Sequence, residues 1–177
     1  MIGYRAVAED ELARIREIDR TETVRVGYRV EEGQMVREEV HWAVPNWSDE
    51  FPAHSHERII VDVSATLADG GIAFGAFDGD RLVGLATYRP RLTQTMAQLG
   101  QLHVSHGYRR RGIGSALLGT VVDRAVRDGA QALYVSATPS GSAVGFYLAH
   151  GFALAKRPHP ELYDLEPEDI HLIRPLP

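Results

Sequence analysis

The chain has 177 residues, no cysteine and a formal net charge of −5 at pH 7. The lack of cysteine excludes disulfides, thiolate metal ligands and a cysteine nucleophile, and the acidic balance argues against general binding to nucleic acid. Because the hydrophobic content of 44% is ordinary and no apolar run approaches about 18 residues, we expect one cytoplasmic globular domain over residues 1–177, without membrane contact.

The first part of the chain predicts a strand, a helix, a hairpin and a second helix. The helices are expected because apolar residues recur three or four positions apart, as Leu12, Ile15 and Ile18 do. The hairpin is expected because apolar and polar residues alternate on either side of the turn Glu31-Glu32-Gly33. The expected ranges are 4–7 (strand), 9–19 (helix), 24–44 (hairpin), 45–52 (loop with aromatic residues) and 54–68 (helix).

The rest of the chain predicts three strands, a helix, a strand, a short helix and two final strands. Asp78-Gly79-Asp80 is a tight-turn signal between the first two strands. The longer helix is amphipathic, with apolar residues four apart, and Gly129 marks its end. The expected ranges are 71–77, 82–88, 95–104, 132–137, 152–156 and 169–175 for strands, and 112–127 and 140–150 for helices. This order indicates one mixed α/β domain.

A glycine-rich turn, Arg109-Arg110-Arg111-Gly112-Ile113-Gly114, lies between a predicted strand and a predicted helix. The first N–H groups of a helix have no partner within it, and glycines let an anion approach them closely. The Rossmann pattern does not fit, because Leu117 replaces its third glycine, and no Walker sequence is present. Taken alone, the turn predicts either a phosphate site or an ordinary helix start with solvated arginines.

Together with its surroundings, the turn resembles the GNAT superfamily of N-acetyltransferases. The resemblance covers residues 71–152 and rests on Leu102-x-Val104, the Arg-x-x-Gly-x-Gly turn, and Phe146-Tyr147 followed by Gly151-Phe152. It implies a GNAT fold of the α/β (α+β) class. In that fold a mixed, mostly antiparallel sheet of about six to seven strands is flanked by about four helices, and the two central strands are splayed.

The resemblance implies acetyl-CoA as cosubstrate. Family members hold its pyrophosphate through main-chain N–H groups of the turn and pair its pantetheine arm with the preceding strand. Ser140 stands where many members have an asparagine that contacts the arm, although a serine there is also a good helix N-cap. The residues so implied as cofactor-binding are Leu102, His103, Val104, Arg109, Arg110, Arg111, Gly112, Ile113, Gly114, Ser115 and Ser140.

Two residues are candidates for proton transfer. Tyr147 matches the tyrosine that protonates the departing thiolate in many members, and its alternative role is packing against Phe146. Many members carry a glutamate base where this chain has Gln98, whose amide cannot accept the proton. His103 is therefore the nearest candidate base, or else a strand histidine without a catalytic role. More remote candidates are His41, Glu38, Glu39, Asp49, Glu50, Glu57 or a water chain.

The resemblance implies a transferase, an acyltransferase that acetylates the primary amine of a small molecule by direct attack in a ternary complex. The alternatives are a protein N-terminal or lysine acetyltransferase and a non-catalytic CoA-sensing module on the same fold. We expect no metal site, because the pairs His54/His56 and His103/His106 have no further ligands in a recognisable pattern. We expect the protein to be a monomer or a homodimer. Residues 20–52 are expected to contribute to the acceptor pocket, while Trp42, Trp47 and Phe51 border that pocket or pack a helix.

Overall fold

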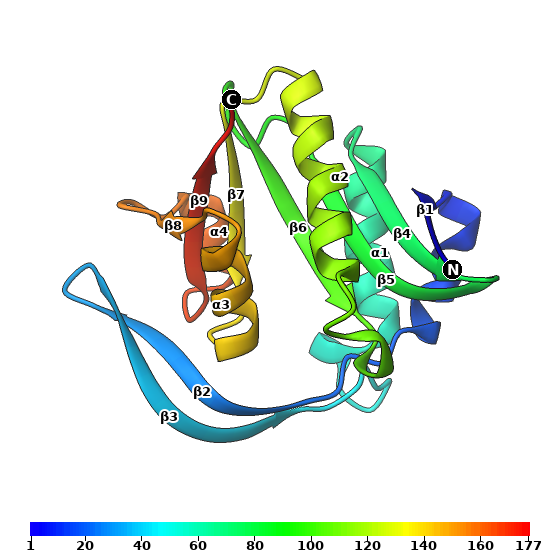
Figure 1. The fold of residues 1–177 in the computed structure, drawn as a ribbon, viewed down its shortest axis with the longest axis horizontal. Coiled ribbons are helices and arrows are strands. Elements are labelled where there is room, and N and C mark those ends of the chain that lie inside the picture. The colour runs from blue at the N-terminus through cyan, green and yellow to red at the C-terminus, as the bar shows by residue number, and fades with distance from the viewer.

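A seven-stranded sheet with the order β1-β4-β5-β6-β7-β9-β8 forms the centre of the computed structural model, which describes residues 1–177 (Figure 1). Neighbouring strands are antiparallel except β6 and β7, which are parallel. The expected mixed, mostly antiparallel sheet is therefore confirmed. Its strands are β1 (Ile2–Ala6), β4 (Ile72–Asp78), β5 (Arg81–Arg89), β6 (Met96–Val104), β7 (Ala132–Ala137), β8 (Ala153–Leu154) and β9 (Ile170–Pro175).

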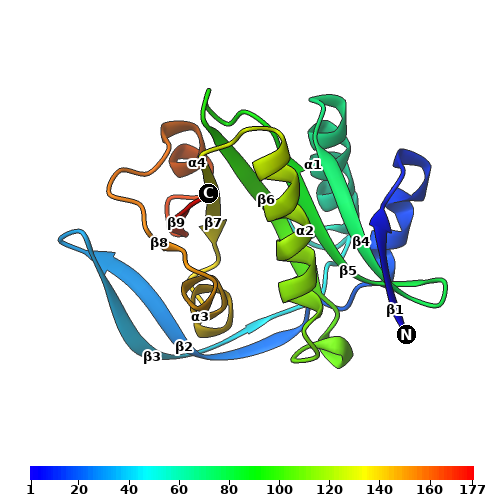
Figure 2. The same cartoon turned by 45° about the horizontal axis from the view of Figure 1, so that its top comes forward.

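Helices cover both faces of this sheet (Figures 1 and 2). The helices α2 (Ile113–Arg127) and α3 (Gly141–Ala149) lie on one face and share the largest apolar cluster with it. The opposite face carries two separate apolar clusters. One lies under α1 (His56–Ala68) and the 3-10 helix η1 (Glu9–Glu17), and the other lies under α4 (Pro160–Leu165). Two short 3-10 turns, η2 (Pro52–His54) and η3 (His106–Tyr108), complete the helical segments. None of the helices is long and apolar enough to cross a membrane.

Two N-terminal elements differ in detail from their predictions. Residues 9–17 form a 3-10 helix, and the apolar residues Leu12, Ile15 and Ile18, spaced three apart, match its period of about three residues per turn. The next helix, α1, begins at His56 because the Ser55 side chain accepts the N–H of Arg58 at 3.0 Å and caps it. The short helix α4 was not predicted.

The central strands β6 and β7 separate toward their carboxyl ends. They pair only between Met96–Gln98 and Ala132–Tyr134. Beyond that point β6 contains a register irregularity against β5, where the Thr87 hydroxyl accepts the N–H of Gln101 at 2.8 Å. Such a bulge bends a strand, and β7 meanwhile stays paired with β9 along its whole length. The expected splay is confirmed, and we call the gap between the diverging strand edges the split.

A two-stranded ribbon runs across the open end of the split, formed by β2 (Glu22–Glu31) and β3 (Gln34–Val44) (Figures 1 and 2). Near its start, the Arg109 guanidinium donates to the carbonyl of Arg20 at 3.0 Å. Farther along, the N–H of Tyr28 donates to the carbonyl of Pro139 at 3.0 Å. The ribbon therefore connects the turn that follows β6 to the turn that follows β7.

Candidate functional site

The turn between β6 and α2 has the backbone shape of an anion site. Arg110 and Gly112 have positive φ values of 60° and 78°, and Gly112 is the N-cap of α2. A Cβ added at Gly112 would meet no atom within 4 Å, so the space beside the glycine is open. A backbone that alternates between left-handed and ordinary conformations turns successive N–H groups toward one concavity.

Six consecutive N–H groups of this turn, from Arg110 to Ser115, donate no hydrogen bond within the chain. The first bond of the helix runs from the N–H of Ala116 to the carbonyl of Gly112 at 3.0 Å. Unpaired donors at the positive end of a helix dipole are suited to a phosphate group. The N–H of Arg109 already donates to His106 at 3.4 Å, so the free donors begin one residue later than the sequence suggested.

The three arginines of the turn have different surroundings. The Arg109 side chain points inward, where Nε donates to the carbonyl of Val104 at 3.1 Å and the guanidinium lies 3.5 Å from Glu22. Arg110 is exposed, and the exposed Arg111 lies over the Tyr108 ring at 5.2 Å. Arg109 therefore anchors the ribbon, while Arg110 and Arg111 stand in solvent beside the free N–H groups.

The strand β6 presents an unpaired backbone edge to the split. Its pairing with β7 ends at Gln98, so the edge from Leu99 to Val104 has no strand neighbour on that side. The side chains of Leu102 and Val104 pack against the apolar cluster under α2. An extended ligand with amide groups can bind such an edge as an added strand would.

His103 is held in a polar and aromatic contact on β6. Its Nε2 donates to Gln101 Oε1 at 2.8 Å, and its ring meets the buried Trp47 edge-on at 4.9 Å between centroids. Burial, together with the positive charges of Arg20 and Arg109, lowers the pKa of His103 to about 4. The ring is therefore neutral at pH 7 and holds a proton only weakly. Trp47 belongs to the apolar cluster under α1.

Tyr147 of α3 has a buried ring and a hydroxyl without a partner. Its side chain is only 6% exposed, and its ring lies 5.3 Å from both Phe146 and Phe152 in edge-on contacts. The hydroxyl makes no hydrogen bond in the chain. Burial and then the negative charge of Asp169 raise the pKa of Tyr147 well above its ordinary value. At neutral pH the residue is thus a phenol whose proton is not engaged elsewhere.

Two serines near the split have partners of their own. The buried Ser140 accepts the N–H of Ala143 at 3.2 Å and caps α3, which is the plainer of its two expected roles. Ser115 Oγ lies 3.0 Å from His150 Nε2, and His150 Nδ1 donates to the carbonyl of Phe146 at 2.7 Å. This chain of contacts joins the start of α2 to α3.

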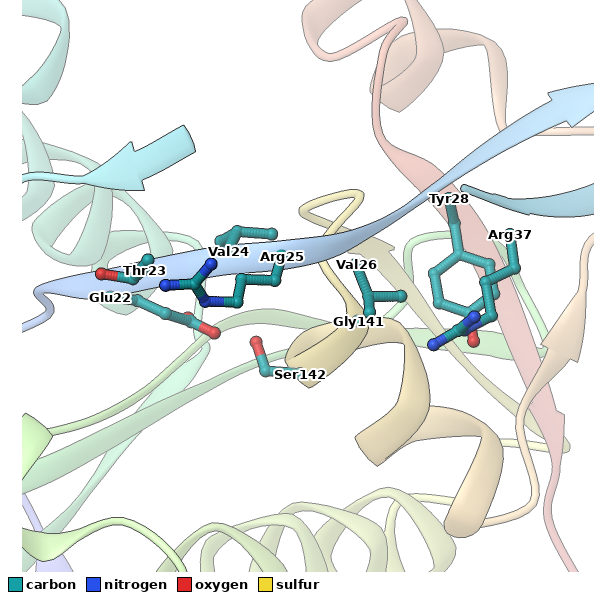
Figure 3. Close-up of a pocket in the computed structure, with 9 residues that line it drawn as sticks. All are labelled: Glu22, Thr23, Val24, Arg25, Val26, Tyr28, Arg37, Gly141 and Ser142. Carbon is teal, nitrogen blue, oxygen red and sulfur yellow. The ribbon is translucent and has the colours of Figure 1, made fainter. Parts of the chain in front are cut away.

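A cavity of about 380 Å³ lies between β2 and the start of α3. Figure 3 shows the side chains of Glu22, Arg25 and Ser142 around it, with Tyr28 and Arg37 at its other end. Seven of the nine residues that line it belong to residues 20–52, and the contribution of this segment to the acceptor pocket stays a prediction. The six remote base candidates are all exposed, namely His41, Glu38, Glu39, Asp49, Glu50 and Glu57. No group of three or more side chains is arranged to hold a metal ion.

Sequence reasoning missed a pair of carboxyl groups between α4 and β9. The N–H of Asp169 donates to the carbonyl of Glu166 at 3.2 Å, so the two residues lie in one turn. Burial, and then the charge and hydrogen bond of Glu166, raise the pKa of Asp169 to about 7. Two carboxylates three positions apart ahead of a strand are visible in the sequence, but their neighbours depend on the fold.

Comparisons with known proteins agree with this geometry. Residues 35–152 match the sequence profile of the acetyltransferase (GNAT) family. Nourseothricin acetyltransferase has 21% identity and a TM-score of 0.76, with 99% of each chain covered. A protein of Bacillus anthracis str. Ames assigned as streptothricin acetyltransferase, in complex with acetyl coenzyme A, has 15% identity and a TM-score of 0.72 over 99% of this chain and 98% of that one.

A third similar structure is PaiA N-acetyltransferase from Thermoplasma acidophilum in complex with coenzyme A. It has 16% identity and a TM-score of 0.65, with 99% of each chain covered. At such identities these structures support the fold and not a shared substrate. No curated protein matches the sequence.

Proposed function

This chain belongs to the acetyltransferase (GNAT) family, and we propose that it transfers the acetyl group of acetyl-CoA to a primary amine of a small molecule. The observation that carries the proposal is the row of six unpaired N–H groups, residues 110–115, at the start of α2. It lies in the turn that follows β6, one of the two strands that form the split. The phosphate-binding donors and the strand edge are therefore continuous along the chain.

The residues of the turn and of β6 fit the cosubstrate in two parts. The pyrophosphate would accept hydrogen bonds from the turn, where open space beside Gly112 leaves room for it. The exposed Arg110 and Arg111 would add charge-assisted contacts. The pantetheine arm would pair with the backbone edge of β6 from Leu102 to Val104, opposite Ser140 at the start of α3.

The reaction needs a nucleophilic amine and a proton for the leaving sulfur. Holding the amine and the thioester together in the split raises their effective concentration, and this proximity speeds the attack of the amine on the thioester. The Tyr147 hydroxyl is suited to protonate the thiolate, because burial keeps it neutral and no group of the chain accepts its proton. His103 lines the cofactor strand, and its low pKa leaves it neutral but weakly basic.

A small acceptor is favoured over a protein chain by the position of the ribbon. The strands β2 and β3 cross the open end of the split and are tied down at both turns, by Arg109 and by Pro139. The cavity of about 380 Å³ under β2 has the size of a small-molecule site. Nourseothricin is included among the candidate acceptors to be tested, because the acetyltransferase named for it has a similar fold over the whole chain.

The proposal is tested by incubating the purified protein with acetyl-CoA and a panel of primary amines. The panel contains nourseothricin, polyamines, amino acids, aminoglycosides and peptides with free N-termini. We expect thiol release with at least one small amine, together with the acetylated product in the mass spectrum. Turnover confined to the peptides would indicate a protein acetyltransferase. Acetyl-CoA binding without turnover on any amine would instead indicate a CoA-sensing module.

A further inference from the structure

The cavity between β2 and the start of α3 is lined by more positive than negative side chains. Among its nine lining residues, Arg25 and Arg37 carry positive charge and only Glu22 carries negative charge. The Glu22 carboxylate lies 3.5 Å from the Arg109 guanidinium, which offsets its charge. The chain as a whole has a net charge of −5, so the cavity differs in sign from the molecule around it. Such a local field attracts anions.

Neither arginine of the cavity has a carboxylate partner in the chain. Arg25 and Arg37 form no ion pair. By contrast, Arg29 on the same ribbon does not line the cavity, and it contacts Glu31 at 2.7 Å and Glu38 at 3.3 Å. The ribbon therefore neutralises the arginine outside the cavity and leaves the two arginines that line it available to a ligand.

An irregularity in the ribbon places Arg25 at the cavity. Val24, Arg25 and Val26 follow one another and all line the cavity, which the strict alternation of a regular strand does not allow. The register between β2 and β3 shifts between Val24 and Val26, and such a bulge changes the direction of a side chain. Figure 3 shows Arg25 at the end of the cavity with Ser142, and Arg37 at the other end.

Close packing of the ribbon against α3 fixes the walls of the cavity. A Cβ added at Gly141 would lie 2.8 Å from the Cβ of Val26, so the strand leaves no space between itself and the start of the helix. The N–H of Tyr28 also holds the ribbon to the carbonyl of Pro139 at 3.0 Å. Because these walls are in place before a ligand arrives, binding here requires little ordering of the chain.

The cavity adjoins the residues that fit the cosubstrate. Glu22 lines it and contacts Arg109, which directly precedes the row of unpaired N–H groups. On the helix side, Ser142 Oγ lies 3.0 Å from Oγ of Ser140, the residue expected to contact the pantetheine arm. An anionic group bound by Arg25 would therefore lie beside both parts of the proposed cosubstrate site.

We propose that this cavity is a subsite for an anionic group, a phosphate or a carboxylate, which Arg25 and Arg37 bind through charge-assisted hydrogen bonds. The inference rests on the proposed function and extends it, because the two substrates are the two sources of such a group. One source is acetyl-CoA, whose pyrophosphate would lie at the neighbouring turn. The other is the acceptor, which would then carry an acid group beside its amine, as an amino acid does.

The test compares the double variant Arg25→Gln/Arg37→Gln with wild type. Both side chains are exposed, so glutamine should leave the Tm unchanged. The matched control Arg29→Gln removes the same charge from an exposed position of the ribbon that does not line the cavity. Calorimetry measures the Kd for CoA and for pantetheine, which has the same arm without phosphates. Thiol release measures the KM for each amine of the panel.

Two results support the subsite and identify its occupant. If the anion is a phosphate of the cosubstrate, the double variant should raise the Kd for CoA roughly tenfold or more and leave the Kd for pantetheine unchanged. If the anion belongs to the acceptor, the Kd for CoA should stay unchanged. The KM for amino acids should then rise roughly tenfold or more, and that for polyamines should not. Arg29→Gln should match wild type in every measurement.

Other results overturn the subsite, and they are separable from failure of the proposed function. An unchanged Kd for CoA together with an unchanged KM for every amine would overturn it. A Kd that rises equally for CoA and pantetheine would overturn it as well, because the arginines would then support the ribbon without binding an anion. If wild type turns over no amine, the proposed function fails, and the Kd for CoA in the double variant alone decides the inference.

Discussion

Replacing Tyr147 by phenylalanine should separate catalysis from folding, because the hydroxyl of this residue has no structural partner. Its ring packs edge-on against Phe146 and Phe152, and phenylalanine keeps both contacts. The hydroxyl makes no hydrogen bond within the chain and is not among the fully buried polar atoms without a partner, so its removal leaves no protein group unsatisfied. We therefore expect Tyr147→Phe to leave the free energy of unfolding unchanged or to raise it by about 1 kcal/mol.

The same substitution should slow acetyl transfer strongly. Loss of a general acid lowers kcat by roughly 10²–10⁴-fold, which corresponds to about 3–5 kcal/mol of transition-state stabilisation. The CoA Kd should change little, because the cofactor contacts come from the turn and β6. The assay measures kcat by thiol release, the CoA Kd by calorimetry and the Tm by thermal unfolding.

A matched control is Tyr4→Phe, on the exposed edge strand β1 at the far side of the sheet, which should leave all three quantities unchanged. The reasoning is refuted if Tyr147→Phe weakens CoA binding by the same factor as kcat, or if it lowers the Tm markedly. Either result would make Tyr147 a packing residue whose hydroxyl supports the fold.

Three further predictions concern the turn, the ribbon and the carboxyl pair. Gly112→Ala should cost about 1–2 kcal/mol of stability because its φ is 78°, and calorimetry should show a CoA Kd at least roughly tenfold higher. Arg109→Leu removes donors to Val104 and Arg20 and should speed hydrogen exchange in β2. Asp169→Asn should remove the fall in stability that this carboxyl contributes as pH rises from about 4 to about 7, measured as the difference from wild type in denaturant unfolding across that range.

The sign of the last prediction follows from proton binding. The pKa of Asp169 is raised above its ordinary value, so the folded state binds more protons than the unfolded state between the two values. Stability due to this group is therefore highest at low pH and is lost as pH rises through the folded pKa. An asparagine has no such dependence, and a variant that keeps the wild-type pH profile would contradict the pKa.

The Gly112 variant has a matched control, and the other two variants have outcomes that would contradict the predictions. Gly119→Ala, on the exposed side of α2 with open space around it, should raise stability by roughly 0.5–1 kcal/mol and leave the CoA Kd unchanged. Unaltered CoA affinity in Gly112→Ala would locate the phosphate elsewhere. Unaltered exchange in β2 of Arg109→Leu would mean that the other contacts, such as those of Tyr28 with Pro139 and of Thr21 with His106, hold the ribbon without Arg109.

The turn and its flanking elements could be predicted from the sequence because their signals are local. Gly112 marks a left-handed residue at a helix start, the apolar spacing of α2 gave its range within one residue, and β7 has its predicted bounds. The side-chain roles were less accessible. Arg109 was expected to bind the cofactor or to stand in solvent, but its contacts with Val104 and Arg20 depend on segments 5 and 89 residues away.

The missed features depend on short elements or on long-range contacts. The helix α4 has six residues and no side-chain cap, which is too little for a periodic pattern. The two carboxyl groups of Glu166 and Asp169 form no motif, because their neighbours are set by the pairing of β9 with β7, in which Ile170 lies opposite Ala137. The charge state of His103 likewise depends on burial and on Arg20, 83 residues earlier in the chain.

The central claim, acetyl transfer from acetyl-CoA to a small amine, is tested most directly by thiol release across the amine panel, with the product identified by mass. The account predicts thiol release that requires both acetyl-CoA and a small primary amine, with one acetyl group added to that amine. Tight acetyl-CoA binding without thiol release on any amine of the panel would contradict it.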